Sequence, residues 1–151
     1  MAGGVKKLVL VAACALIDAS GRVLLAQRPN GKPMAGLWEF PGGKIEPGEN
    51  PEACLIRELK EELDIEVRPS SLKPLGFSSH AYGPEDGNFN ILLLLYTCRR
   101  WRSGPTPREG QKLAWIRPSG LHDYPMPEAD LPLIGPLCDA VTMNYTNGLM
   151  F

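Results

Sequence analysis

The sequence predicts an α/β fold in which a mixed β-sheet lies between helices. Strand-like segments recur along the chain, and the one at residues 89–99 is apolar on both faces. An amphipathic helical pattern at residues 50–63 separates these segments into two groups. A second helical pattern, at about residues 130–141, follows the last strand-like segment. Strands mixed with two helices in this order are typical of a sheet that is covered on both faces.

Length and composition indicate one domain. The chain has 151 residues, of which 44% are hydrophobic, and this is enough to bury a core without disulfides or metals. No internal repeat or low-complexity segment divides it. We therefore expect a single domain over residues 1–151, with residues 142–151 as a loosely held tail.

The first two strand-like segments cover residues 7–17 and 22–28. Between them, residues 18–21 supply the Asp, Ser and Gly of a hairpin loop, so the two strands are predicted to pair. Residues 29–36 are rich in Pro and Gly and are predicted to form a loop.

The first helix is predicted to begin after Asn50, which is a favourable N-cap, with Pro51 at its first position. Its apolar residues recur at helical spacing and form one stripe that packs on the core: Ala53, Ile56, Leu59 and Leu63. The other side of the same helix is charged.

Three further strands are predicted near residues 72–80, 89–99 and 112–116. The middle one is apolar on both faces, which indicates a central, covered strand. In the second helix, Pro136 should kink the helix or delay its start.

Charge and hydropathy exclude two classes of partner. The formal net charge of −1 offers no basic surface for a nucleic-acid polymer. The apolar run at residues 8–17 is too short to cross a membrane and lacks a signal-peptide cleavage site, so we expect a cytoplasmic protein. The cysteines are widely spaced and predicted to be buried thiols in a reducing compartment: Cys14, Cys54, Cys98 and Cys138.

Residues 42–65 gather seven acidic side chains against three basic ones. On a helix, Glu58, Glu61 and Glu62 lie within a turn on one face. Like charges this close repel one another, and a solvated helix face is the ordinary explanation for such a string. A hard divalent cation would instead turn the repulsion into coordination, because Mg²⁺ binds carboxylate oxygens together with substrate phosphates.

The spacing within this stretch favours the second explanation. Six residues stand at offsets that would match by chance on the order of once in ten million windows; they are Gly43, Glu49, Arg57, Glu58, Glu61 and Glu62. The pattern resembles the signature of the Nudix hydrolases. The chain departs from that signature at Asp64, where the family has a glycine suited to a left-handed helix end, and we expect a small stability cost there.

The resemblance covers nearly the whole chain and is closest to the MutT-type branch, through the segments LAQRP, LWEFPGGKIE, REGQKLAW and YPMPEADLP. It implies a Nudix-type α/β/α sandwich with a mixed β-sheet. It also implies a site for Mg²⁺, for which Mn²⁺ can substitute, held by Gly42, Glu58, Glu61, Glu62 and Glu109. By the resemblance, Arg57 would orient these acids. Glu49 matches the signature but is equally compatible with a structural role that ties the loop to the helix.

By the same resemblance, the chain would hydrolyse a small-molecule nucleoside triphosphate to the monophosphate and pyrophosphate. The metal would neutralise the phosphates and lower the pKa of a bound water, which a carboxylate then deprotonates. Glu58 and Glu109 are the candidates for this base, and we favour Glu58. For Glu109, a solvated loop acid is the alternative. Lys44 could add a positive charge.

The resemblance further implies a nucleoside pocket lined by Arg28 and Phe40, with Asp130 at the position from which the MutT branch recognises the base. We expect an oxidised purine nucleotide such as 8-oxo-dGTP, and hence a role in nucleotide sanitation and DNA repair. A CTP or 5-methyl-dCTP pyrophosphohydrolase and a non-catalytic Nudix domain that binds a nucleotide or a protein are the alternatives. Structurally, Arg28 could be a surface pair, Phe40 core, and Asp130 the N-cap of the last helix.

Overall fold

The computed structural model describes residues 5–149, and the side chains of residues 5–143. The strands are β1 (Lys7–Leu16), β2 (Val23–Gln27), β3 (Trp38–Glu39), β4 (Gly42–Lys44), β5 (Leu72–Tyr82), β6 (Phe89–Cys98) and β7 (Lys112–Ile116). The α-helices are α1 (Pro51–Leu63) and α2 (Ile134–Leu149), and 3₁₀ turns occupy Pro69–Ser71, Pro84–Asp86, Pro118–Asp123 and Leu131–Leu133.

The strands form two sheets. The larger has the order β4-β1-β6-β5 and is mixed, because β1 and β6 run parallel while β4 and β5 run antiparallel to their neighbours. The smaller, β3-β2-β7, is antiparallel. Strand β6 lies in the interior of its sheet, as its two apolar faces predict. The predicted α/β class with a mixed sheet is confirmed.

The predicted pairing of the first two strands is wrong. Strands β1 and β2 belong to different sheets and meet only at an isolated bridge between Ile17 and Val23. The turn itself forms, since the Asp18 carboxylate accepts hydrogen bonds from the backbone N–H groups of Ser20 (3.0 Å) and Arg22 (2.8 Å). Beyond it the strands diverge, because the second half of β1 and most of β2 are fully buried and each packs within its own sheet.

Helix α1 begins where the sequence predicts. The Asn50 side chain accepts a hydrogen bond from the backbone N–H of Ala53 (2.8 Å), and Pro51 lies in the first turn. The helix ends at Asp64, whose backbone is left-handed (φ 55°, ψ 39°). Its N–H group donates to the carbonyl of Lys60 (3.0 Å), so the helix end that glycine favours is formed by an aspartate.

Replacing Asp64 with glycine is expected to shift Tm by no more than about 3 °C. Glycine removes the left-handed strain but raises the entropy of the unfolded chain. It also removes exposed ion pairs from Asp64 to Lys60 (3.0 Å) and Arg108 (3.3 Å), which contribute little. Calorimetry of both proteins measures the shift. An increase of roughly 10 °C would show that the strain outweighs these losses.

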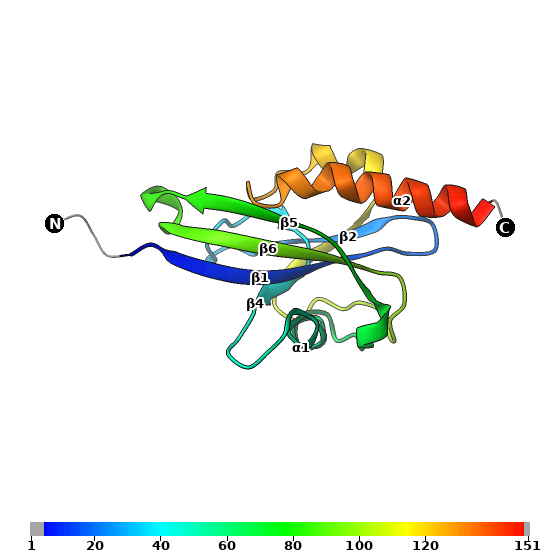
Figure 1. Cartoon of the computed structure of the whole chain (residues 1–151), viewed down its shortest axis with the longest axis horizontal. Helices are drawn as coiled ribbons and strands as arrows, with labels where there is room; N and C mark the ends of the chain where they lie inside the picture. Colours follow the sequence, from blue (N-terminus) through cyan, green and yellow to red (C-terminus); the bar gives the residue numbers. More distant parts are fainter. Residues whose placement is uncertain (1–4, 150–151) are drawn as a thin grey trace.

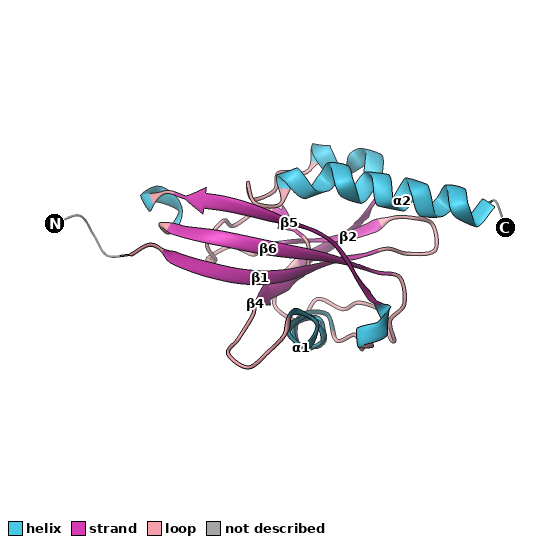
Figure 2. Cartoon of the chain, viewed as in Figure 1, coloured by secondary structure: helices cyan, strands magenta, loops and turns pink. Residues whose placement is uncertain are grey.

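Two hydrophobic cores lie on opposite faces of the larger sheet. Because successive side chains of a strand point to opposite faces, Ala13 and Ala15 of β1 enter one core, whereas Cys14 and Leu16 enter the other. Helix α1 covers the second core with Cys54, Leu55, Leu59 and Leu63. Helix α2 covers the first with Ile134, Leu137 and Val141. Figures 1 and 2 show the two helices on opposite sides of the strands.

The last helix starts later and extends further than predicted. The 3₁₀ turn at Leu131–Leu133 precedes α2, which places Pro136 in its first turn, where proline is tolerated. Residues 142–149, expected in a loosely held tail, are helical. The helix continues because no proline follows Pro136. The rest of the expected tail, residues 150–151, lies outside the described residues.

Two observations bear on membranes and redox chemistry. No helix within residues 5–149 is long and apolar enough to cross a membrane. All four cysteines are free thiols, as predicted. Cys14, Cys54 and Cys98 are buried, and Cys138 is half-buried.

Candidate active site

Arg57 organises the acidic face of α1. Its guanidinium donates to both carboxylate oxygens of Glu49, from Nε (2.6 Å) and from Nη2 (2.9 Å). Its Nη1 donates to Glu58 (2.9 Å) and Glu61 (3.4 Å). The hydrogen bond from Arg57 lowers the pKa of Glu49 to about 2, and Glu49 also accepts from the backbone N–H of Glu46 (2.9 Å). Glu49 thus ties the preceding loop to the helix, which supports its structural role.

Glu58 and Glu62 lie side by side on this face. Burial, the hydrogen bond with Glu58 and the charges of nearby acids together raise the pKa of Glu62 to about 9. The Glu58 side chain is 15% exposed, whereas that of Glu61 is 55% exposed. The structure therefore brings Glu58 and Glu62 together and leaves Glu61 at the edge of the group.

Glu109 reaches the same place from a distant loop. The backbone N–H of Arg108 donates to the carbonyl of Glu62 (3.0 Å), one of the unpaired carbonyls at the end of α1. The Gln111 side chain donates to that carbonyl as well (3.0 Å) and accepts from the N–H of Glu109 (2.8 Å). These bonds hold the loop against the helix, so that Glu109 and Glu62 line one hollow.

Two glycines of β4 bring the backbone close to the acids. A Cβ atom on Gly43 would lie 2.4 Å from the carboxyl group of Glu58, and one on Gly42 would lie 2.1 Å from the carbonyl oxygen of Ala12. At Gly42 only glycine fits, because the clash is with backbone, whereas at Gly43 a side chain would displace the Glu58 carboxyl group. Lys44 follows, and its carbonyl accepts a hydrogen bond from Arg57 (3.2 Å).

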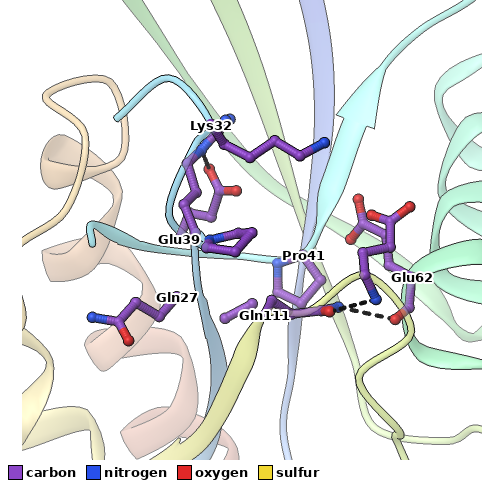
Figure 3. Close-up of a pocket in the computed structure, with 10 residues that line it drawn as sticks. Gln27, Lys32, Glu39, Pro41, Glu62 and Gln111 are labelled. Atoms are coloured by element: carbon purple, nitrogen blue, oxygen red, sulfur yellow. Dashed lines mark hydrogen bonds and ion pairs between the residues drawn. The ribbon is translucent and has the colours of Figure 1, made fainter. Parts of the chain in front are cut away.

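A hollow of about 110 Å³ opens beside Glu62 and Glu109. Figure 3 shows Lys32 and Glu39 on one side of it and Glu62 on the other, with Gln111 bonded to Glu62. Carboxylates and basic side chains thus face the same space. Such a lining suits a phosphate-bearing ligand that arrives with a cation.

A larger hollow, of about 300 Å³, adjoins β1, β6 and the segment before α2. Its aromatic lining residues are Phe40, Tyr82 and Phe89. Asp130 also lines it, is 7% exposed, and has a pKa raised to about 8 by burial and by the charge of Glu39. The backbone N–H of Phe40 and the charge of Arg28 oppose this shift. An aromatic hollow with a buried acid suits a flat ring with a polar edge.

Arg28 and Glu39 line both hollows. Arg28 Nε donates to Glu39 Oε2 (3.1 Å), and Nη1 donates to the carbonyl of Pro33 (3.2 Å). The pKa of Glu39 is raised by burial, and the charge and hydrogen bond of Arg28 offset part of this increase. A ligand that occupies both hollows would therefore lie beside the Arg28–Glu39 ion pair.

Residues 7–134 match the model of the NUDIX domain family. The chain belongs to the Nudix family. It is 38% identical over 120 residues to the CTP pyrophosphohydrolase of Escherichia coli K12, covering 80% of this chain and 84% of that protein. It is 37% identical over 105 residues to the 8-oxo-dGTP diphosphatase of Proteus vulgaris, covering 70% and 88%. A crystal structure of a MutT Nudix hydrolase from Burkholderia pseudomallei superposes with a TM-score of 0.76 at 25% identity, covering 87% and 98%. The chain is a MutT-type Nudix hydrolase.

The donor set of this Nudix helix fits a hard divalent cation, since every candidate ligand is an oxygen. Within residues 5–149, no three acidic, histidine or cysteine side chains are already gathered into a metal-holding group. Glu61 pairs with Arg57 (3.4 Å), as Glu58 does (2.9 Å). After burial, the negative charges of nearby acids contribute to the raised pKa of Glu62, and a bound cation would offset these charges.

The structure also bears on the purely structural roles considered above for Asp130, Phe40 and Arg28. Asp130 occupies the N-cap position of the 3₁₀ turn at Leu131–Leu133, and within the described residues its side chain makes no capping hydrogen bond. Phe40 is 3% exposed and belongs to the core as well as to the hollow. Arg28 forms an ion pair with Glu39, as the structural alternative of a surface pair predicted, and it also lines the smaller hollow.

Two charged residues that line the smaller hollow were not predicted: Glu39 and Lys32. Glu39 directly precedes Phe40, so its position beside a predicted pocket residue was a usable signal. Lys32 lies in a loop without periodicity, and nothing in its local sequence marks it.

Proposed function

We propose that this Nudix hydrolase cleaves a nucleoside triphosphate to the monophosphate and pyrophosphate, using Mg²⁺, with 8-oxo-dGTP as the favoured substrate. The two hollows, which share Arg28 and Glu39 in their linings, carry this proposal. Charged side chains line one, aromatic side chains and a buried acid line the other, and Arg28 with Glu39 line both. A nucleoside triphosphate has the same parts in the same order, a charged chain at one end and a flat base at the other.

At the phosphate end, the metal would be held by the oxygens of Gly42, Glu58, Glu61, Glu62 and Glu109. Bound Mg²⁺ supplies neutralising charge and a more acidic water. Glu58 is our choice of general base, because Arg57 fixes its carboxylate through a 2.9 Å hydrogen bond. Glu109, exposed on its loop, is the alternative base. Lys32 lines the hollow proposed for the phosphates and adds positive charge there, whereas Lys44 lines the larger, aromatic hollow.

At the base end, the substrate is selected by Asp130. A protonated Asp130 would donate to O6 of 8-oxoguanine and accept from its N7–H, much as asparagine does. The raised pKa of Asp130, about 8, supports this protonated form at neutral pH. An ionised Asp130 would instead accept from the exocyclic amine of cytosine. The similarity to a CTP pyrophosphohydrolase makes CTP or 5-methyl-dCTP the second candidate.

Hydrolysis in water enriched in heavy oxygen is expected to place the label in pyrophosphate and none in the monophosphate. The MutT-type resemblance implies attack at the β-phosphorus, and the water oxygen then stays with the pyrophosphate. Mass spectrometry of both products from 8-oxo-dGTP measures this. Label in the monophosphate would mean attack at the α-phosphorus and would refute the proposed geometry.

Pyrophosphate release also distinguishes the enzyme from a non-catalytic Nudix domain. If ordinary, oxidised and methylated nucleoside triphosphates all remain intact with Mg²⁺ and with Mn²⁺, the proposed reaction is wrong and the binding-domain alternative stands. A cytoplasmic location and the lack of a nucleic-acid polymer partner stay predictions.

A further inference from the structure

Strand β5 presents two side chains toward the segment that carries Asp130. His80 and Tyr82 are two residues apart on this strand, so they point to the same face of the sheet. The strand packs against Leu131–Leu133 and against α2, and Figure 1 shows the start of α2 beside β5. Tyr82 is 4% exposed.

Both side chains hold the residues immediately before Asp130. The buried backbone N–H of Ala129 donates to the Tyr82 hydroxyl (3.1 Å). His80 Nε2 lies 2.7 Å from Glu128 Oε2. The His80 and Tyr82 rings contact each other edge to face, with centroids 4.5 Å apart, so the two anchors also support one another.

His80 and Tyr82 act at the wall of the larger hollow of about 300 Å³, which is the proposed base hollow. Tyr82, Ala129 and Asp130 all line it, and the Tyr82 ring packs on Phe89 with centroids 5.0 Å apart. A hydrogen bond from the Asp130 N–H to the carbonyl of Pro127 (3.0 Å) closes the same short segment. A displacement of Ala129 therefore moves the Asp130 carboxyl group relative to the aromatic wall.

We propose that Tyr82 and His80 are positioning residues for base selection, which hold the Glu128–Asp130 segment so that the Asp130 carboxyl group meets the edge of the base. This inference rests on the proposed function. Neither residue touches the phosphate hollow. Their loss should therefore alter the preference between bases.

The test compares Tyr82→Phe and Glu128→Gln with the wild type. Calorimetry measures the dissociation constants of 8-oxo-dGMP and dCMP, which requires no hydrolysis. Tyr82→Phe is expected to change their ratio at least about fivefold, the scale of one lost hydrogen bond. Glu128→Gln should change it less, because the Glu128 side chain is 68% exposed. Exchange of the Ala129 amide proton should also accelerate in Tyr82→Phe.

Ser78→Ala is the matched control. Ser78 lies on the same face of β5 and is 5% exposed, and its hydroxyl has no hydrogen-bond partner among the described residues. This variant should keep the wild-type affinity ratio. An unchanged ratio in Tyr82→Phe, even with a lower Tm, would overturn the proposal. Failure of the wild type to release pyrophosphate would refute the proposed reaction, whereas failure to bind either monophosphate would overturn this inference and leave the proposed reaction standing.

Discussion

Replacing Glu62 with glutamine is expected to lower kcat at least about a hundredfold, the effect of losing one preorganised electrostatic contact. The variant should fold, because glutamine keeps the shape of the side chain and removes a buried acid whose pKa is raised. Glu61→Gln is expected to lose turnover to a similar extent, since it removes a second charged oxygen donor from the proposed metal site. Steady-state kinetics at saturating Mg²⁺ and circular dichroism measure the two properties.

Glu66→Gln provides the control for these variants. Glu66 is a 58% exposed acid just beyond α1 and pairs only at 3.9 Å with Lys60 and Arg102. It does not line the phosphate hollow, so its replacement should leave kcat within about twofold. A folded Glu62→Gln protein with near-normal turnover would remove Glu62 from the metal site.

The acidic helix could be predicted because its signals are local. Asn50 and Pro51 fix its start, and the spacing of Arg57, Glu58 and Glu62 fixes which side chains share a face. Its left-handed end could be predicted because Asp64 stands where the Nudix signature has a glycine. Each of these features depends on residues within a few turns of one another.

The features that sequence analysis missed depend on distant contacts. The turn at Asp18 was predicted correctly, but which sheet each flanking strand joins is decided by partners elsewhere in the chain. Glu39 lines both hollows because β3 pairs with β2, which places Glu39 opposite Ala26 and beside Arg28. Glu109 was expected beside Glu62 through the family resemblance alone, because its position depends on hydrogen bonds to the end of α1 that no local pattern displays.

Replacing Asp130 with asparagine is expected to raise the preference for 8-oxo-dGTP over CTP and to remove its pH dependence. Asparagine donates and accepts at every pH, whereas Asp130 can donate only while it is protonated. Because burial and Glu39 raise its pKa to about 8, the protonated form dominates below pH 8 and the ionised form above it. In the wild type, the ratio of kcat/KM for 8-oxo-dGTP to that for CTP should therefore fall as the pH rises.

Between about pH 7 and pH 9, the ratio of protonated to ionised Asp130 falls roughly a hundredfold for a pKa near 8, so the selectivity ratio should fall tenfold or more. The measurement is kcat/KM for 8-oxo-dGTP, dGTP, CTP and 5-methyl-dCTP at each pH in both proteins. Asp123→Asn, an exposed aspartate outside both hollows, should keep the wild-type profile. If the wild type and Asp130→Asn share one selectivity ratio at every pH, Asp130 does not contact the base. Selection between purine and pyrimidine then rests on the aromatic wall of the hollow.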